Sequence, residues 1–230
     1  MYKEKRRNLV KALELEGVIK SSSLKIAMLK VPREEFVPPE YKDEAYEDRP
    51  LPIPENQTIS APHMCAIMCE AAGLTRGDTL LEIGTGSGYH VALCTEIISP
   101  SDESIEGIIV SIELIKQLAY YARDNLKKTG YYERVHLLVA DGSLGAPVRE
   151  GYQFKKIMVT AAAPRIPPLL IKQLADKGVM VIPVGPRWHQ TLLAVNRDGD
   201  KVTHRQVTYC VFVSLRGRYG HHDSSRENRS

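Results

Sequence analysis

Residues 79–89 read TLLEIGTGSGY, a short apolar run that leads directly into a glycine-rich turn. We expect a strand over 79–83 and a helix after the turn, because glycines at the carboxyl end of a strand let backbone amides approach a ligand. The glycines have the spacing G-x-G-x-G, and Tyr89 stands where the dinucleotide fingerprint G-x-G-x-x-G has its third glycine. The carboxylate of Glu82, just before the turn, would repel a pyrophosphate but attract the ammonium group of a methionyl moiety.

The turn therefore favours S-adenosylmethionine over a nicotinamide dinucleotide as the cofactor. The residues expected to contact this cofactor are Glu82, Gly84, Thr85, Gly86, Ser87 and Gly88. A merely structural turn is the alternative interpretation. A nicotinamide-dependent oxidoreductase and a non-catalytic cofactor-binding module stay open as other classes of protein.

Apolar runs alternate with amphipathic segments after this turn, as in a parallel sheet built from βα units. The expected strands cover 79–83, 108–112, 135–139, 156–160, 179–184, 191–196 and 207–214. Helices are expected between the first five strands, whereas no helix separates the last two. The sequence therefore predicts an α/β fold, a Rossmann-like class I S-adenosylmethionine-dependent methyltransferase with a mostly parallel seven-stranded sheet and a C-terminal antiparallel hairpin at one edge.

Two further acids follow expected strands and extend the predicted cofactor site. Glu113 closes the strand 108–112, where a carboxylate can accept from both ribose hydroxyls of an adenosine. Asp141 and Gly142 follow the strand 135–139, where the carboxylate can accept from the adenine amino group and the glycine leaves room for the ring. The alternatives are an acid favoured by a helix dipole and an ordinary turn. Acids at the ends of three successive strands favour the cofactor site.

The N-terminal part of the chain differs in pattern from the expected sheet. Apolar residues at helical spacing predict short helices over 3–16 and 23–30, and seven prolines between 31 and 62 predict an ordered, irregular loop. Loops of this length in compact domains are often functional. We expect one globular unit made of a helical cap with a proline-rich active-site loop (1–62) and a methyltransferase domain (63–220), followed by a disordered polar tail (221–230).

Bulk composition excludes several classes of protein. With 230 residues, 43% hydrophobic and 26% charged, the chain can form one sizeable domain, and no apolar run approaches the roughly 20 residues of a membrane-spanning helix. The basic N-terminus lacks the apolar region of a secretory signal, so we expect a soluble, cytoplasmic protein, and we take it to be a monomer. A net charge of +3, spread evenly, indicates neither a nucleic-acid nor a membrane partner.

The cysteines, Cys65, Cys69, Cys94 and Cys210, fall in segments expected to be buried helix or strand. They form no C-x-x-C pair, and we find no histidine at metal-ligand spacing. Buried free thiols, and no metal, are therefore expected.

Residues 57–64, QTISAPHM, open the helix that precedes the strand 79–83. Ser60 is a natural N-cap and Pro62 suits a first helical turn, so a structural role is the simplest interpretation. His63 would ordinarily be a surface histidine. A functional role for these residues depends on a resemblance to a known family.

Together with other segments, this loop resembles the protein-L-isoaspartate O-methyltransferase family, whose members methylate damaged aspartyl residues. The matching segments are 31–38 (VPREEFVP), 57–64 (QTISAPHM), 82–88 (EIGTGSG), 141–142 (DG), 161–164 (AAAP) and 182–186 (IPVGP), within about residues 5–220. The element Q-T-I-S-x-P is the most specific, since all methyltransferases of this type share the glycine-rich turn.

The resemblance implies methyl transfer from S-adenosylmethionine, leaving S-adenosylhomocysteine, to the free α-carboxylate of L-isoaspartyl residues in damaged proteins and peptides. Activity on D-aspartyl residues stays open. The resemblance also implies that Ser60 is the active-site hydroxyl and that Gln57, Thr58, Ile59 and Ser60 close over the cofactor. Ser60, His63 and Val213 would contact the substrate. A methyltransferase with a small-molecule acceptor is the alternative.

Three positions depart from the family pattern. Pro54-Glu55-Asn56 stands where glycines are usual, Glu82 replaces the more usual Asp, and Ser214 replaces a typical Pro. None of the changes removes a group that the chemistry requires. The first leaves open how flexible the loop before Gln57 is.

Overall fold

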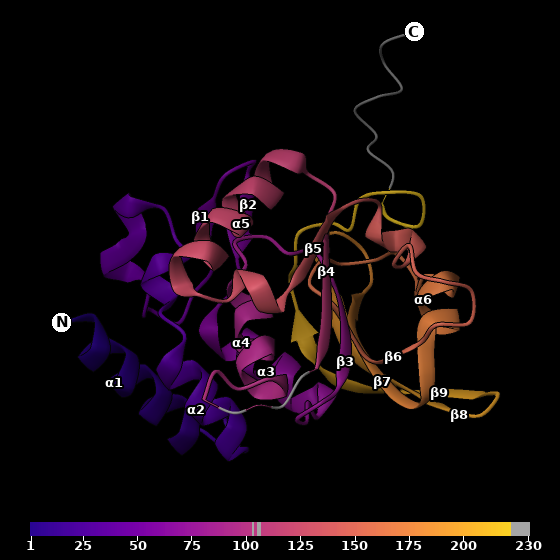
Figure 1. Cartoon of the computed structure of the whole chain (residues 1–230), viewed down its shortest axis with the longest axis horizontal. Helices are drawn as coiled ribbons and strands as arrows, with labels where there is room; N and C mark the ends of the chain where they lie inside the picture. Colours follow the sequence, from indigo (N-terminus) through magenta and orange to yellow (C-terminus); the bar gives the residue numbers. More distant parts are fainter. Residues whose placement is uncertain (103, 105–106, 222–230) are drawn as a thin grey trace, which may run out of the picture.

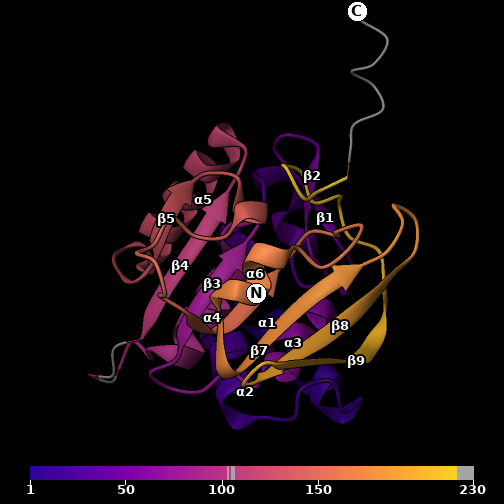
Figure 2. The same ribbon diagram turned by 90° about the vertical axis from the view of Figure 1, so that its right-hand side faces the viewer.

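The computed structural model describes residues 1–102, 104 and 107–221, and a seven-stranded sheet forms its centre (Figure 1). The strands are β3 (Thr79–Ile83), β4 (Ile108–Glu113), β5 (His136–Val139), β6 (Phe154–Val159), β7 (Leu174–Val184), β8 (Gln190–Asp198) and β9 (Lys201–Cys210), in the spatial order β5-β4-β3-β6-β7-β8-β9. The first five of these strands are parallel, and β8 and β9 are antiparallel to their neighbours. The predicted Rossmann-like sheet with a C-terminal hairpin at one edge is confirmed (Figure 2).

The last strand lies earlier in the sequence than the predicted range 207–214. β9 begins at Lys201 and ends at Cys210, and its first half is polar and exposed because it lies at the sheet edge. Beyond Cys210 the chain leaves β8 and pairs with Ala162. The Ala162 amide donates to the Val213 carbonyl (2.8 Å), and the Leu215 amide donates to the Ala162 carbonyl (2.7 Å). This pairing brings the C-terminal segment to the carboxyl end of β6.

Helices cover the two faces of the sheet unequally (Figure 1). One face packs against α3 (Pro62–Ala72), α4 (Tyr89–Ile98) and α5 (Lys116–Thr129), and the other against the short α6 (Pro168–Gln173) and loops. Helix α4 is buried along its whole length because the N-terminal helices pack on its outer side.

The connection between β5 and β6 differs from the prediction of a helix between each pair of the first five strands. It contains a 3-10 turn, η4 (Gly142–Leu144), and a loop. Gly145, Pro147 and Gly151 explain the difference, since these residue types interrupt helices. A further 3-10 turn, η3 (Tyr132–Arg134), precedes β5.

The N-terminal part contains the two expected helices, α1 (Tyr2–Leu15) and α2 (Ser22–Lys30), followed by a largely irregular segment. That segment includes the 3-10 turns η1 (Arg33–Glu35) and η2 (Pro39–Glu44) and an antiparallel hairpin of β1 (Leu51–Ile53) and β2 (Gln57–Ile59). Glu55 and Asn56 form the hairpin turn with positive φ angles of 63° and 53°, as in a type I′ turn. The turn thus forms without the glycines that usually supply this conformation.

The segment 31–38 anchors these N-terminal elements on α4. Arg33 and Phe36 are fully buried. The guanidinium carbon of Arg33 lies 4.9 Å from the centre of the Tyr89 ring, and Phe36 meets the same ring edge-on at 5.6 Å. Arg33 Nε donates to the Ala45 carbonyl at 2.8 Å. Nη1 and Nη2 of Arg33 have no hydrogen-bond partner among the described residues, so the Tyr89 ring is a principal contact of this buried cation.

No helix in the described part of the chain is long and apolar enough to span a membrane. The tail predicted to be disordered over 221–230 lies, apart from His221, outside the described residues.

Candidate active site

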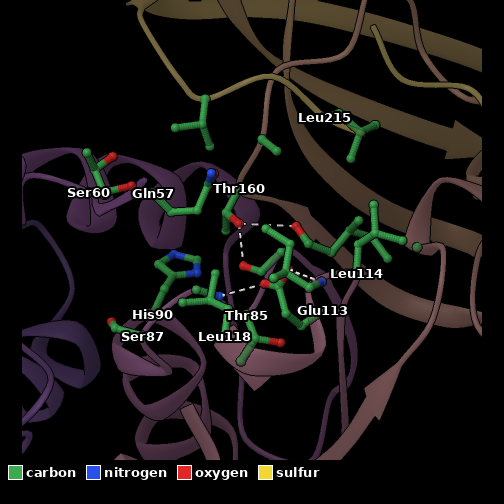
Figure 3. A pocket seen from close by; sticks show the side chains of 18 of the residues that line it. Gln57, Ser60, Thr85, Ser87, His90, Glu113, Leu114, Leu118, Thr160 and Leu215 are labelled. Atoms are coloured by element: carbon green, nitrogen blue, oxygen red, sulfur yellow. Dashed lines mark hydrogen bonds between the residues drawn. The ribbon is translucent and has the colours of Figure 1, made fainter. Parts of the chain in front are cut away.

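A pocket opens at the carboxyl ends of β3, β4 and β6, the edge where open α/β sheets bind ligands (Figure 3). The β1-β2 hairpin and the segment 213–216 also contribute to its walls. The sequence-predicted residues that line it are Gln57, Thr58, Ile59, Ser60, Gly84, Thr85, Gly86, Ser87, Glu113, Gly142 and Val213. The fold therefore brings together segments that are far apart in the chain.

The glycine-rich turn between β3 and α4 forms one wall of this pocket. Gly84, Gly86 and Gly88 have φ angles of 95°, 58° and 90°. At Gly84 a Cβ atom would also lie 2.5 Å from Thr160 Oγ1, so the position requires glycine. Gly88 was predicted to contact the cofactor, but it does not line the pocket. It faces α5, where a Cβ atom would lie 3.2 Å from Leu126.

Glu113 lines the pocket with a buried carboxylate that is already oriented. Its oxygens accept hydrogen bonds from the amides of Gly86 and Ile115, each at 3.0 Å. Burial raises the pKa of Glu113. Each carboxylate oxygen can accept two hydrogen bonds, so the group retains the capacity to accept from ribose hydroxyls.

Glu82 lies beneath the pocket and does not line it, contrary to the predicted direct contact with the cofactor. Its fully buried carboxylate accepts from the Ser111 hydroxyl (2.5 Å) and is 2.9 Å from His90 Nδ1. The Thr85 hydroxyl lies 2.7 Å from that of Ser111. His90 and Thr85 both line the pocket, so Glu82 acts on it through these neighbours.

Asp141 was predicted to contact the adenine, but its carboxylate has other partners and is not part of the pocket lining. Oδ1 accepts from the amide and hydroxyl of Ser143 at 2.9 and 2.6 Å, and Oδ2 accepts from the Arg218 amide at 2.8 Å. Asp141 thus fixes the C-terminal segment to the end of β5. The neighbouring Gly142 does line the pocket.

A second pocket adjoins the first on the side of the C-terminal segment. Its lining includes Ser60, His63 and Val213, the residues predicted to contact substrate, together with Thr58 and Thr160. Apart from His63, these residues belong to both pockets. They therefore form a shared wall where a ligand in one pocket can meet a ligand in the other.

Ser60 does not cap α3, although its position had favoured that structural role. The N-cap residue is Ala61, and no side chain caps the helix. The Ser60 hydroxyl has no hydrogen-bond partner among the described residues, whereas Thr160 donates to the carbonyls of Ile83 and Gly84. His63 lies 3.0 Å from Asp48 Oδ1 through Nδ1. Among the described residues, Ser60 and Thr58 thus present the hydroxyls on the shared wall that have no hydrogen-bond partner.

Three buried free thiols, those of Cys65, Cys69 and Cys94, lie on α3 and α4 near this site. Contrary to the sequence prediction, one histidine does have metal-ligand spacing. His90 precedes Cys94 by one helical turn, and its Nε2 lies 3.8 Å from Cys69 Sγ. A hydrogen bond from Cys94 lowers the pKa of the Cys69 thiol. Sequence reasoning missed His90, although H-x-x-x-C was a visible signal.

The sheet is mostly parallel, and its glycine-rich turn and strand-end acid line one pocket. These features define the class of Rossmann-like S-adenosylmethionine-dependent methyltransferases. The family model described as protein-L-isoaspartate(D-aspartate) O-methyltransferase matches residues 4–220 of the chain. The chain belongs to this family. The resemblance identified from its motifs is confirmed, and with it the methyl donor that the family uses, S-adenosylmethionine.

Individual relatives agree with this assignment over nearly the whole chain. A protein-L-isoaspartate O-methyltransferase of Hyperthermus butylicus is 52% identical over 223 residues, covering 95% of this chain and 91% of the relative. That of Ignicoccus hospitalis is 54% identical over 213 residues, covering 92% and 97%. A solved structure of a protein-L-isoaspartate O-methyltransferase, 27% identical, has a TM-score of 0.79 over 93% of this chain and 67% of that one.

A second solved structure with the same fold contains a bound ligand. It is a Plasmodium falciparum protein described as a protein-L-isoaspartate O-methyltransferase in complex with S-adenosyl-L-homocysteine. It has a TM-score of 0.79 at 24% identity and covers 92% of this chain and 98% of that one.

Proposed function

We propose that this methyltransferase transfers the methyl group of S-adenosylmethionine to the free α-carboxylate of L-isoaspartyl residues in damaged proteins. The observation that carries the proposal is the shared wall, where Ser60 belongs both to the glycine-lined pocket and to the pocket beside Val213. The first pocket has the residues that a nucleoside cofactor needs. The second is bordered by the backbone of 210–213, which a peptide can approach in an extended conformation.

The residues present fit the cofactor. In this proposal Glu113 accepts from the ribose hydroxyls, and the glycine-rich turn offers backbone close to the methionyl group. Glu82 acts from beneath by fixing His90 and, through Ser111, Thr85. The bound cofactor supplies a methyl group on a positively charged sulfur.

The acceptor needs little activation from the protein. An α-carboxylate has a reference pKa below about 4, so it is ionised at neutral pH and requires no general base. The step that this chain must promote is alignment of the attacking oxygen with the methyl carbon. Orientation of two reactants can lower a barrier by roughly 7–11 kcal/mol. We assign this role to Ser60, whose hydroxyl donates a hydrogen bond to the carboxylate and forms no covalent bond.

Recognition through the peptide backbone would explain how one enzyme accepts many damaged sequences. An isoaspartyl residue routes the chain through its side-chain carboxyl and leaves the α-carboxylate free. Methylation converts that carboxylate into an ester with a good leaving group, which can cyclise to a succinimide. Opening of the succinimide regenerates some normal aspartate. Val213 and His63 border the groove in which such a peptide would bind.

The decisive experiment compares two peptides that are identical except for Asp or isoAsp at one position, each incubated with the full chain and labelled S-adenosylmethionine. We expect base-labile label only on the isoAsp peptide. Equal labelling of both peptides, or no labelling of either despite S-adenosylhomocysteine binding, would reject the proposal. The second result would favour a small-molecule acceptor or a non-catalytic module, and binding of NADH in place of S-adenosylhomocysteine would favour an oxidoreductase.

The cytoplasmic location, the monomeric state, the absence of nucleic-acid and membrane partners and the acceptance of D-aspartyl residues stay predictions.

A further inference from the structure

A cluster of soft side chains lies between α3 and α4, directly beneath the cofactor pocket. Cys69 lies on α3, one helical turn after Cys65, and His90 and Cys94 lie one turn apart on α4. Cys69, His90 and Cys94 are 3%, 8% and 0% exposed. Figure 3 shows the His90 ring among the side chains that line the pocket. The proposed methyl transfer uses neither thiol.

The ligand atoms of this cluster lie close together. One atom each from Cys69, His90 and Cys94 lies within 4.8 Å of the other two, and Cys69 Sγ is 3.8 Å from His90 Nε2. Zinc binds thiolate sulfur at about 2.3 Å and imidazole nitrogen at about 2.0–2.1 Å, so the ligand atoms of a tetrahedral site are roughly 3.6–3.8 Å apart. The distance from Cys69 Sγ to His90 Nε2 already has this value, and the upper limit of 4.8 Å between the three ligand atoms exceeds it by about 1 Å.

The surroundings of His90 favour one nitrogen as the ligand. Nδ1 lies 2.9 Å from Glu82 Oε1, and Glu82 is itself fixed by the Ser111 hydroxyl. Metal-bound histidines characteristically donate their second ring N–H to a carboxylate, which fixes the tautomer and the ring orientation. Nε2 is then the nitrogen left for a metal, on the side of Cys69. Cys94 Sγ lies 4.0 Å from Nδ1, so its side chain must rotate toward Nε2 to bind the same ion. A core packed only for volume would not require this carboxylate.

We propose that Cys69, Cys94 and His90 Nε2 bind a zinc ion beneath the cofactor pocket. Both thiols release their protons to solvent on binding, and two thiolates balance the charge of the ion in a buried setting. Three protein ligands leave one tetrahedral position for a water molecule. Thiolate and imidazole ligands select zinc over magnesium or calcium, which prefer oxygen. The ion would brace α3 against α4 and hold His90 at the pocket wall.

The test measures metal content in the full chain. We expect zinc in the purified wild type and, after removal by a chelator, an intense thiolate charge-transfer absorption when Co²⁺ is added. Cys69→Ala and Cys94→Ala should each lose both signals. Cys210→Ala is the matched control, because Cys210 is half-buried on β9 away from the cluster, and it should retain them. The proposal is overturned if the wild type binds neither Zn²⁺ nor Co²⁺, or if a variant with both Cys69→Ala and Cys94→Ala binds them as well as the wild type. A Cys69–Cys94 disulfide in protein purified without reductant would also overturn it.

A second variant covers the case in which alanine at these core positions prevents folding. Glu82→Gln keeps the shape of the side chain but weakens its hold on His90, and we expect it to lower the Zn²⁺ affinity about 10–100-fold, as for other carboxylates behind a ligating histidine. Zn²⁺ should raise the thermal midpoint of the wild type more than that of this variant. Equal Zn²⁺ affinity in the two proteins would contradict the assigned geometry.

Discussion

The Ser60 hydroxyl lies on the wall between the two pockets without a partner among the described residues, so the consequences of removing it are narrow. We expect Ser60→Ala to lower kcat on an isoAsp peptide by about 100-fold, because small misplacements of reacting groups cost that much. The affinity for S-adenosylhomocysteine should stay the same. Ser60→Thr, which keeps a hydroxyl, should retain part of the activity. Steady-state methylation and calorimetric titration measure the two effects, and unchanged turnover in the alanine variant would remove Ser60 from the mechanism.

Glu113 should make the affinity of the site for S-adenosylhomocysteine decrease at low pH. Burial is the main cause that raises the pKa of Glu113 above its ordinary value of 4.5. Protonation therefore begins at a higher pH than in an exposed glutamate. Because only the ionised group accepts from both ribose hydroxyls, affinity for S-adenosylhomocysteine should fall as the pH drops through the raised pKa.

The variant Glu113→Gln isolates this titration. Hydrogen bonds to a charged group contribute about 1.5–3 kcal/mol, so the affinity for S-adenosylhomocysteine should fall roughly 10–100-fold at neutral pH. In this variant the affinity for S-adenosylhomocysteine should also no longer decrease at low pH. Titrations at several pH values provide the measurement, and an identical pH profile in the two proteins would assign the dependence to another group.

How far the site could be predicted depends on the direction of each side chain. The pattern of strand-end acids indicated Glu113, which lies at the last position of β4 and lines the pocket. Glu82 lies one residue before the end of β3, on the same face as Leu80, because alternate residues of a strand point to opposite faces. That face packs against α4, so its carboxylate meets His90. The alternation of residues along the strand predicts which face Glu82 occupies. Only the fold shows that α4 packs on this face.

The β1-β2 hairpin holds two residues in a backbone conformation that L-amino acids disfavour. Glu55 and Asn56 both have positive φ, which asparagine tolerates better than glutamate. We expect Glu55→Asn to raise the free energy of unfolding by up to about 1 kcal/mol, because the left-handed conformation costs most residues roughly 1–2 kcal/mol. Urea denaturation measures the change, with Glu55→Gln, which removes the charge at the same position, as the control. A destabilised Glu55→Asn protein would show that the turn conformation is not strained.

The end of β9 is not visible in the local sequence pattern. Val207, Tyr209, Val211 and Val213 continue the alternation of an exposed strand beyond its true end, so the pattern predicted a strand up to 214. The strand ends at Cys210 because the chain there turns to Ala162, a long-range pairing with no local signal. Ser214 in place of the family's proline costs no bond in this pairing, which uses the Val213 carbonyl and the Leu215 amide.

A buried polar network connects the N-terminal elements to one another and to the site. Arg6 Nη2 donates to both carboxylate oxygens of Glu34 at 3.0 and 3.1 Å, and Arg6 Nε donates to the Tyr46 hydroxyl at 2.7 Å. Tyr46 in turn donates to Glu34. Burial raises the pKa of Tyr46, so its hydroxyl remains a donor. Arg33, which directly precedes Glu34, packs on Tyr89 at the pocket wall. This contact connects the network to the site.

Removing one partner from this network should therefore affect both stability and ligand binding. Glu34→Ala leaves a buried guanidinium without its anion, which costs about 3–5 kcal/mol and should lower the thermal midpoint by roughly 10 °C. The control is Glu14→Ala, which breaks the exposed Lys25–Glu14 pair and should change the midpoint little. S-adenosylhomocysteine should bind Glu34→Ala more weakly, because α1 and η1 share this anchor and Arg33 of η1 packs on Tyr89 at the pocket wall. A destabilised Glu34→Ala protein that binds the ligand with full affinity would show that the N-terminal elements fold independently of the site they border.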